Sequence, residues 1–365
     1  DEADYVIAIG HCGTEPRIDY YKSSDIIANT TGLTAFIDGH SHYVMPGDTV
    51  EDKEGRPVVL TQTGCYLKNI GLMHISDGRV TTELISEYET EDDTVRERMN
   101  QLDTTVEDQL GRTVAVLDNK QYIMSPEDPN VRIVRNHNTN SSDLCADAIY
   151  WYFNEYMDMD CDAAIVNSGG IRSDVEAGSF SYLSAKQLHP FGNVLCMVEI
   201  DGQTLLDVLE FGANKTPGES GRFMKAAGLV YTIDTNIEST AAYDAEDSFV
   251  APPTGEYRVK DVKIYNRETG SYEPLEADRK YKVGGQNYIL RNGGSGMSML
   301  LDSEVVTDYV TEDYLALAAY AQAFRQGEDG MPHINNANAP AADYSGYIYD
   351  YEDPYGSDRI IIKTE

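Results

Sequence analysis

The sequence has few basic residues, few cysteines and no long apolar segment. Among 365 residues, 28 Lys and Arg stand against 62 Asp and Glu, which gives a formal net charge of −34. An acidic surface of this size repels phosphate backbones, so we expect no nucleic-acid polymer as a partner. The longest apolar run, Tyr314–Ala321, falls far short of the roughly 20 residues that a membrane-spanning helix needs. We therefore expect no membrane span.

Cysteine chemistry and a secretion signal are also not indicated. The five cysteines are odd in number and widely spaced, and they form no CxxC pair: Cys12, Cys65, Cys145, Cys161 and Cys196. This pattern excludes a disulfide framework and favours mostly buried thiols. The chain opens directly on a strand pattern, DYVIAI, at residues 4–9. Because a domain rarely starts in mid-sheet, we expect that a further piece of the protein precedes residue 1 or has been cut away.

The length fits two domains, and the apolar pattern divides them. In residues 1–88 strands alternate with turns, and the strands are predicted at 4–9, 33–38, 57–61, 70–76 and 80–87. Between 91 and 111 the apolar residues follow the spacing of one helix face instead: Val95, Met99, Leu102, Val106 and Leu110. Asp92 and Asp93 suit its beginning and Gly111 its end. We interpret this mostly polar helix as a connector over residues 89–112.

Residues 113–365 predict a second, mixed α/β domain. Helices are expected from Asn140, as the capping residue, to about Met157, then at 204–211 and 312–326. Strands are expected at 163–167, 194–200, 229–233, 257–264 and 280–284. The tyrosine- and aspartate-rich tail, 341–356, is predicted to lie on the surface.

Three histidines at predicted strand ends could bind metal. His11 follows the first strand, and His40 and His42 follow the second in Gly39–His42. The carboxyl ends of strands are where α/β proteins build their sites, and imidazole is a ligand for Zn, Mn, Fe or Co. A single histidine is more often a packed or surface residue, but three beside glycines favour metal.

Glycine-rich turns in the second domain could approach a ligand closely. Asn167–Arg172 joins two glycines to a cationic fork; the alternative is a tight turn with an exposed arginine. Pro190–Asn193 holds Phe191 on a rigid turn, which suits a stacking platform; the alternative is a ring folded into the core. Tyr288 precedes a third glycine loop, Gly293–Gly296, and Arg135 adds a further cation.

Taken in order, these motifs resemble the 5′-nucleotidase family of metallophosphoesterases, which includes UDP-sugar hydrolases and 2′,3′-cyclic-nucleotide phosphodiesterases. Thr139–Asp147 is similar to the family's TNxxxLxADA, Asn167–Arg172 to NGGGIR and Pro190–Asn193 to PFGN. Gly221–Leu229 resembles GxFLQVSGL and Gly293–Gly296 resembles GGDG. In the first domain, His11 fits the position of SHLG and Gly39–His42 that of GHSH.

The resemblance implies the C-terminal part of a calcineurin-like, four-layer αββα metal domain (1–88), a linker helix (89–112) and a C-terminal α/β nucleotide-binding domain (113–365). It implies two divalent metals of the Zn, Mn, Co or Fe class that activate water for attack on phosphate. His11 and His40 would bind one metal and His42 the other.

The resemblance also implies how the second domain would hold a nucleotide or nucleoside. Phe191 and Tyr288 would sandwich the base, and Asn167 would hydrogen-bond to it. Arg172 would hold the ribose hydroxyls, with Arg135 near the sugar or phosphate. The remaining implied substrate-binding residues are Gly170, Asn193, Gly228 and Ser295.

Two departures from the family pattern stand out. The DxH, GDxxD and GNHD motifs, which carry the other metal ligands and the catalytic His and Asp, do not occur, so the catalytic residues are unknown. We expect that this chain lacks the first half of its metal domain and is inactive alone. The missing segment would precede residue 1 or be supplied separately. Ser295 replaces the family's Asp, which weakens the expected ribose contact by about 1.5–3 kcal/mol.

Three functions remain open from the residues. The first is part of a secreted or cell-surface nucleotidase-like hydrolase, periplasmic in a Gram-negative source. The second is a non-catalytic nucleotide- or nucleoside-binding module. The third is a structural surface protein in which Phe191, Tyr288 and Arg172 bind nothing.

Overall fold

The computed structural model describes residues 3–14, 22–88, 90–245 and 247–364. Contacts within the chain divide it into two compact units. The first is Asp1–Asn100 with Ala245–Asp247, and the second is Gln101–Asp244 with Ser248–Glu365. Across the described ranges, no helix is both long and apolar enough to cross a membrane.

The first unit is built on a four-stranded sheet with the order β1-β2-β4-β3, beside a separate β5-β6 hairpin. β1, β2 and β4 are parallel, and β3 pairs antiparallel with β4. The strands are β1 (Ile7–Ile9), β2 (Ala35–Ile37), β3 (Val44–Glu51), β4 (Pro57–Thr63), β5 (Ile70–Ser76) and β6 (Arg79–Ile85). Helix α1 (Ser23–Asn29) packs on β3 and β4. The fully buried core is small: Ile27, Phe36, Val58 and Leu60.

The five predicted strands of this unit are confirmed, whereas α1 and β3 were not predicted. β3 contains Pro46 and Gly47 and is largely exposed, so its sequence carries no alternation of apolar and polar residues. Pairing with the antiparallel neighbour β4 therefore holds β3 as a strand, although the sequence of β3 has no strand pattern.

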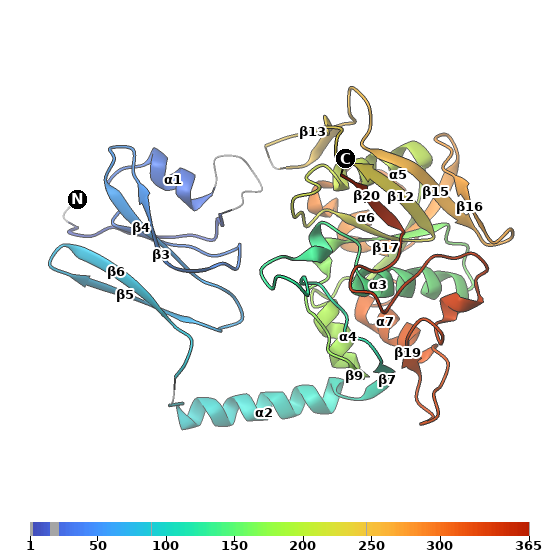
Figure 1. The fold of residues 1–365 in the computed structure, drawn as a ribbon, viewed down its shortest axis with the longest axis horizontal. Coiled ribbons are helices and arrows are strands. Elements are labelled where there is room, and N and C mark those ends of the chain that lie inside the picture. Colours follow the sequence, from blue (N-terminus) through green and yellow to red (C-terminus); the bar gives the residue numbers. More distant parts are fainter. Residues whose placement is uncertain (1–2, 15–21, 89, 246, 365) are drawn as a thin grey trace. The chain divides into compact units, whose positions relative to one another are not determined.

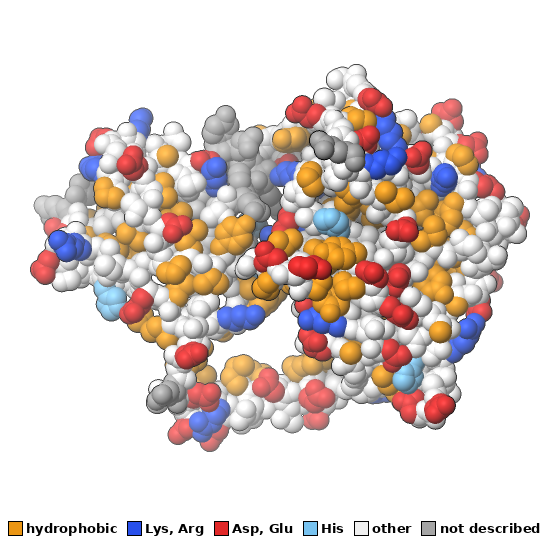
Figure 2. Space-filling model, in the orientation of Figure 1, with side chains coloured by type: hydrophobic (Ala, Val, Ile, Leu, Met, Phe, Trp, Pro, Cys, Tyr) orange, Lys and Arg blue, Asp and Glu red, His pale blue; other side chains and the backbone are white. Residues whose placement is uncertain are grey.

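The predicted connector is helix α2 (Asp93–Leu110). Asp92 caps it by accepting hydrogen bonds from the backbone N–H groups of Thr94 and Val95. None of its residues is buried, and hydrophobic side chains reach the surface along it (Figure 2). The boundary between the two units falls inside this helix, between Asn100 and Gln101.

The second unit contains two larger sheets and a small one. Their strand orders are β11-β8-β17-β10-β18, β16-β15-β12-β20 and β19-β7-β9, and β13 and β14 form a short pair. The strands of the five-stranded sheet are β8 (Ala163–Asn167), β10 (Leu195–Asp201), β11 (Met224–Ala227), β17 (Lys280–Gln286) and β18 (Glu304–Thr307). Those of the four-stranded sheet are β12 (Leu229–Asp234), β15 (Val259–Asn266), β16 (Ser271–Pro274) and β20 (Ile360–Lys363). The others are β7 (Thr113–Leu117), β9 (Gly178–Ser181), β13 (Ala242–Tyr243), β14 (Phe249–Ala251) and β19 (His333–Ile334).

Helices cover both faces of the five-stranded sheet, which we call the central sheet (Figure 1). They are α3 (Asn140–Trp151), α4 (Tyr182–Leu188), α5 (Gly202–Gly212), α6 (Asn287–Leu290) and α7 (Asp313–Gln322). The side chains of β8 alternate between two cores: Ala164 and Val166 join the one containing α3 and α7, and Ala163 and Ile165 the one containing α5. Because both faces are covered, β8 is an unbroken apolar run, which is why it was predictable.

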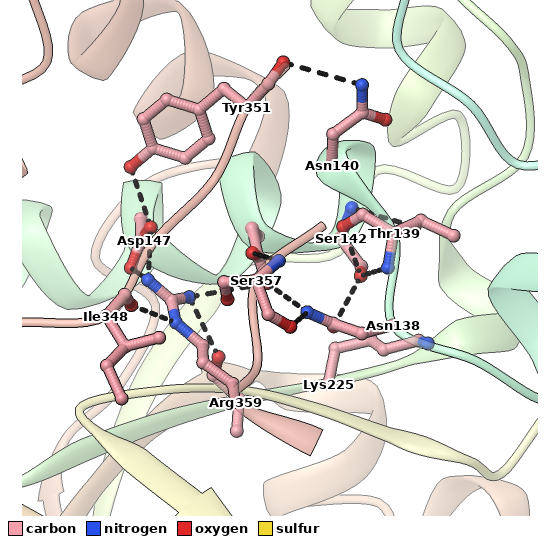
Figure 3. Close-up of polar contacts among 12 residues, drawn as sticks. Asn138, Thr139, Asn140, Ser142, Asp147, Lys225, Ile348, Tyr351, Ser357 and Arg359 are labelled. Atoms are coloured by element: carbon pink, nitrogen blue, oxygen red, sulfur yellow. Dashed lines mark hydrogen bonds and ion pairs between the residues drawn. The ribbon is translucent and has the colours of Figure 1, made fainter. Parts of the chain in front are cut away.

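Most residues of the predicted surface tail, 341–356, are exposed or half-buried as expected, but Ala341, Tyr347 and Tyr351 are buried, which corrects the prediction at these positions. Tyr347, Tyr351 and Arg359 are buried because α3 presents two buried carboxylates to them. Asp147 accepts hydrogen bonds from Tyr351 at 2.7 Å and from Arg359 at 2.6 and 2.7 Å (Figure 3). Tyr347 also donates to Asp147, at 2.7 Å. Asp143 accepts from the backbone N–H of Ser357 at 2.8 Å. The buried tyrosines of the tail serve this network, whereas polar residues such as Glu352 and Asp353 are exposed.

The predicted cap of α3 is also corrected. Thr139, not Asn140, is the capping residue, and it forms a reciprocal pair of hydrogen bonds with Ser142. Asn140 is the first helical residue, and its side chain bonds the backbone of Lys120 and Tyr122. This part of the family-like motif therefore fixes the N-terminus of α3 within the core.

A buried lysine lies beside this network and leads to a test of stability. The side-chain nitrogen of Lys225 donates to the backbone carbonyl of His137. Burial lowers the pKa of Lys225 well below its usual value, although Asp143 opposes the shift. Between that lowered pKa and about 10.4 in the unfolded chain, the unfolded state binds more protons, so stability rises with pH.

We expect Lys225→Met to flatten the rise in unfolding free energy between pH 8 and 10. Urea unfolding followed by the fluorescence of Trp151, the sole tryptophan, measures this for the second unit. The exposed Lys263→Met is the matched control and should leave the pH dependence as in the wild type. Parallel pH profiles for wild type and Lys225→Met would contradict the expectation.

Candidate functional site

Four segments that the sequence analysis identified as motifs meet at one end of the central sheet. β8 ends at Asn167, and its parallel neighbour β17 ends at Gln286. β10 runs antiparallel to β17 and pairs Leu195 with Gln286, so the turn before β10 lies at the same end. β11 pairs Met224 with Asn167, which brings in the segment before β11 as well. The register of the strands thus gathers loops that are up to about 130 residues apart in the sequence.

Asn167 forms the floor of this candidate site. Its side-chain nitrogen donates to the backbone carbonyl of Gly221 at 3.1 Å and to the hydroxyl of Ser295 at 3.3 Å. The backbone N–H of Ser295 donates to the Tyr288 hydroxyl at 3.1 Å. Ser295 has a positive φ of 58°, which Ser adopts only where the surrounding loop imposes it. Hydrogen bonds therefore join three of the predicted residues.

Phe191 and Arg172 form a second group. The Phe191 ring is 61% exposed, so the alternative of a ring folded into the core is excluded. The Arg172 guanidinium lies over that ring, 5.6 Å from its centroid. The backbone N–H of Arg172 donates to Leu188 at the end of α4, and the carbonyl of Asn193 accepts from the backbone N–H of Asp313. The exposed ring of Phe191 and the cation of Arg172 therefore lie on turns that backbone hydrogen bonds hold in place.

A buried polar cluster, which the sequence did not reveal, lies behind these residues. The Gln286 side-chain nitrogen donates to the Asp313 carboxylate at 2.7 Å and lies 3.4 Å from Nδ1 of His189. The His189 ring also makes a hydrogen bond with the backbone of Gly170. Burial lowers the pKa of His189, against the pull of Asp313, which favours a neutral ring. His189 precedes the Pro-Phe-Gly turn, but no spacing linked it to Gln286 or Asp313.

Arg135 and Gly228 fall in different places. The backbone carbonyl of Arg135 accepts from Ser220, next to Gly221, so that this residue adjoins the candidate site. Gly228 follows the end of β11 where Ala227 pairs with Ala164, the end away from Asn167. Its φ is 70°, and a Cβ there would come within 2.5 Å of the Tyr150 ring. The structure does not bring Gly228 to the candidate site, whereas Gly221, which was not predicted, touches Asn167.

Two of the three histidines predicted to bind metal stand on strained turns. His40 and His42 have positive φ values of 79° and 61°, and the His11 and His40 rings meet edge to face with centroids 5.1 Å apart. Asp38 holds the loop after β1 by accepting from the backbone N–H of Cys12 at 2.8 Å and of Gly13 at 3.0 Å.

Among the residues that the structure describes, the set of possible metal ligands is too small for two metal ions. Within the residues that the structure describes, no three or more His, Cys, Asp or Glu are grouped as a metal would require. A single zinc ion takes three or four protein ligands. The described residues of the first unit therefore do not fit a two-metal centre.

Comparison with known proteins agrees with the fold. The family model described as 5′-nucleotidase, C-terminal domain, matches residues 113–302. The mouse 5′-nucleotidase is 25% identical over 345 residues, covering 86% of this chain and 55% of the mouse protein. A trifunctional nucleotide phosphoesterase of Bacillus subtilis is 23% identical over 328 residues, covering 86% of this chain and 20% of that protein. A cell wall protein of Listeria monocytogenes is 26% identical over 220 residues, covering 58% and 25%.

Among solved structures, the 5′-nucleotidase precursor of Thermus thermophilus superposes with a TM-score of 0.68 at 20% identity. The match covers 91% of this chain and 64% of the Thermus chain, and it concerns the fold. The chain spans about half the length of the mouse relative and a fifth of the Bacillus relative.

Proposed function

Because the chain belongs to the 5′-nucleotidase family through its C-terminal domain, we propose that its second unit binds the nucleoside part of a nucleotide, as one half of a phosphoester hydrolase. The observation that carries this proposal is the convergence of four loops at the end of the central sheet, where a polar floor adjoins an exposed aromatic ring. Polar side chains on loops that also carry an exposed aromatic ring suit a base attached to a sugar.

Each residue has a proposed role. Phe191 and Tyr288 stack on the base, and Asn167 hydrogen-bonds to its edge. Arg172 bonds the ribose hydroxyls. Arg135 provides positive charge near the sugar or phosphate. Because the chain as a whole is acidic, such charge must come from individual residues at the site.

The glycine turn and two smaller side chains complete the proposed site. Gly170 allows close approach of the ligand to the backbone, and Asn193 shapes the turn that holds Phe191. Ser295 stands in place of a carboxylate and accepts weaker bonds from ribose.

Hydrolysis is a proposal for the whole protein, with two divalent ions activating the attacking water. His11, His40 and His42 would supply some of the ligands, and others would come from outside the described residues. A cell-surface or extracellular location is proposed with it, in line with the cell wall protein among the relatives. A binding module without catalysis is the second candidate, favoured by the incomplete ligand set among the described residues.

We expect no metal-dependent phosphate release from AMP by this chain, because the described ligands do not complete a metal centre. The measurement is released phosphate with Mn²⁺, Co²⁺ or Zn²⁺, with and without EDTA. The variant His40→Ala is compared with His74→Ala, whose exposed ring pairs with Glu83 on the hairpin. Release abolished by EDTA and by His40→Ala, but not by His74→Ala, would contradict this expectation and show a complete metal centre.

The binding role is tested by calorimetric titration of the full chain with adenosine. Saturable one-site binding supports the nucleoside-binding proposal. If no purine or pyrimidine nucleoside binds at millimolar concentration, the proposal fails and a structural role for the fold is left.

A further inference from the structure

An ion pair with two hydrogen bonds joins two segments that adjoin the candidate site. The carboxylate of Glu219 accepts from the backbone N–H of Arg132 at 2.9 Å and from its side-chain Nε at 2.6 Å. The Arg132 and Glu219 side chains are only 19% and 20% exposed, so salt and water screen this pair less than a surface pair. The two residues lie 87 positions apart, and no local pattern in the sequence links them.

The segment that follows Glu219 is fixed to the floor of the candidate site. The backbone carbonyl of Ser220 accepts from the Ser168 hydroxyl at 2.7 Å. The carbonyl of Gly221 accepts from the Asn167 side chain at 3.1 Å. These bonds come from the backbone of the segment, so they tie it to the floor without the Glu219 side chain. That side chain is therefore committed to the other segment.

The other segment carries Arg135. Arg132 stands directly before a single 3₁₀ turn that ends at Arg135, and the backbone N–H of Arg135 donates to the carbonyl of Arg132. The far end of the turn meets the first segment through two neutral bonds. The N–H of Ser220 donates to the carbonyl of Arg135 at 3.0 Å, and the Asn136 side chain donates to the carbonyl of Pro217 at 3.2 Å. The ion pair holds the near end.

The contacts of this turn differ in how well they fix its orientation. Ile133 and Val134 are buried and anchor the turn to the core, but hydrophobic contacts are not directional. Charge-assisted hydrogen bonds are shorter and about twice as strong as neutral ones, and two at one carboxylate fix distance and angle together. The pair of Arg132 and Glu219 is therefore the contact best suited to set the direction in which the Arg135 side chain leaves the turn.

We propose that Glu219 is a positioning residue of the nucleotide site, which through Arg132 holds the turn so that Arg135 meets the anionic part of a bound nucleotide. Glu219 acts through these two arginines and not by contact with the ligand. Because Arg132 neutralises it, a carboxylate can stand beside the site without repelling phosphate. This inference rests on the proposed nucleotide-binding function of the second unit, in which Arg135 supplies positive charge.

Glu219→Gln breaks the pair with almost no change in side-chain volume. Both carboxylate oxygens accept from Arg132, so an amide satisfies one of the two donors and sets its own N–H group against the other. We expect the affinity for AMP to fall about 3- to 20-fold. The measurement is calorimetric titration of the full chain in EDTA, which keeps bound metal from contributing. An unchanged affinity in Glu219→Gln would overturn the inference.

The matched control is Glu155→Gln. Glu155 forms an ion pair with Arg267, and its neighbour Asn154 bonds Cys161 just before β8 begins. This pair thus lies at the end of β8 opposite to Asn167. Glu155→Gln should leave the affinity for AMP within about twofold of the wild type. An equal loss in Glu155→Gln and Glu219→Gln would overturn a role specific to the site.

A double-mutant cycle separates positioning from a purely structural role. Arg135→Met should weaken AMP about 10- to 100-fold, through loss of a charged hydrogen bond. Adding Glu219→Gln to Arg135→Met should then cost less than about twofold more, because Glu219 acts through Arg135. The same fold-loss with and without Arg135 would show that Glu219 only supports the fold, and would overturn the inference.

Two further measurements keep the test decisive. If Glu219→Gln does not fold, Arg132→Met takes its place in the cycle, since it removes the Nε bond and keeps the backbone bond to Glu219; its loss should be smaller, about 2- to 5-fold, and should also vanish without Arg135. If the unaltered chain binds neither AMP nor adenosine, the proposed function is overturned, and the positioning role with it. If it binds both and the cycle shows no coupling, only the positioning role is overturned.

Discussion

Replacing Arg359 by methionine is expected to destabilise the second unit by about 3–5 kcal/mol. The Arg359 side chain is fully buried and bonds both oxygens of Asp147, as well as the backbone carbonyls of Ile348 and Ala226. Without it, the carboxylates of Asp143 and Asp147 stay in the core without their guanidinium partner. Urea unfolding monitored through Trp151, which contacts Tyr320 in that unit, measures the loss.

The control is Arg325→Met. Arg325 pairs with Asp343 at the surface, so its loss should cost less than about 1 kcal/mol. Arg359→Lys keeps the charge but not the paired geometry and should fall between the two. Because unpaired buried carboxylates take up protons more readily, the deficit of Arg359→Met should shrink as the pH falls from about 7 toward 5. A deficit below about 1 kcal/mol at neutral pH would show that the tail is not anchored by this pair.

Replacing Phe191 by alanine is expected to weaken adenosine binding by about 5- to 150-fold, which corresponds to about 1–3 kcal/mol of stacking. The ring is largely exposed and lies against the Arg172 guanidinium. It therefore contributes little to the free energy of unfolding. The melting temperature should therefore stay within about 2 °C of the wild type. Calorimetric titration and thermal unfolding, run on the same sample, separate the two effects.

Phe191→Tyr should retain most of the affinity, since any aromatic face can stack. Tyr88→Ala removes an exposed aromatic ring from the first unit and should not change binding. If Phe191→Ala binds adenosine as tightly as the wild type, the stacking platform lies elsewhere, and Tyr288 alone would be the next residue to test.

The strands that the sequence predicted in the second unit share one property: each of them carries buried side chains. β8 is apolar throughout because two cores cover it, and α2 was visible through its apolar stripe and its Asp92 cap. The described helices and strands that escaped prediction are β3, β7, β9, β11, β13, β14, β16, β18, β19, β20, α1, α4 and α6. These are short or mostly exposed, and β3 is held by its partner strand more than by its own residues.

The same division applies to the candidate site. Motifs near Asn167, Phe191 and Tyr288 were recognisable from local chemistry, because each combines glycine with an aromatic, amide or cationic side chain. Gly221 and Gly228 stand in the same motif, so the sequence does not show which of them lies near Asn167. The strand register decides this, because it places the beginning of β11, and with it Gly221, beside Asn167. Gln286 carried no signal, since a glutamine at a strand end is commonplace.

Composition and periodicity by themselves determined an acidic, two-unit α/β chain with a connecting helix and glycine-rich loops. These properties follow from local spacing and charge, which the sequence states directly. Only the tertiary structure decided that Tyr347 and Tyr351 of the tail are buried and bond Asp147. It likewise decided that His189, Gln286 and Asp313 form one cluster. Such contacts join residues from 27 to more than 200 positions apart, and the free energy of pairing buried polar groups depends on geometry that no local pattern records.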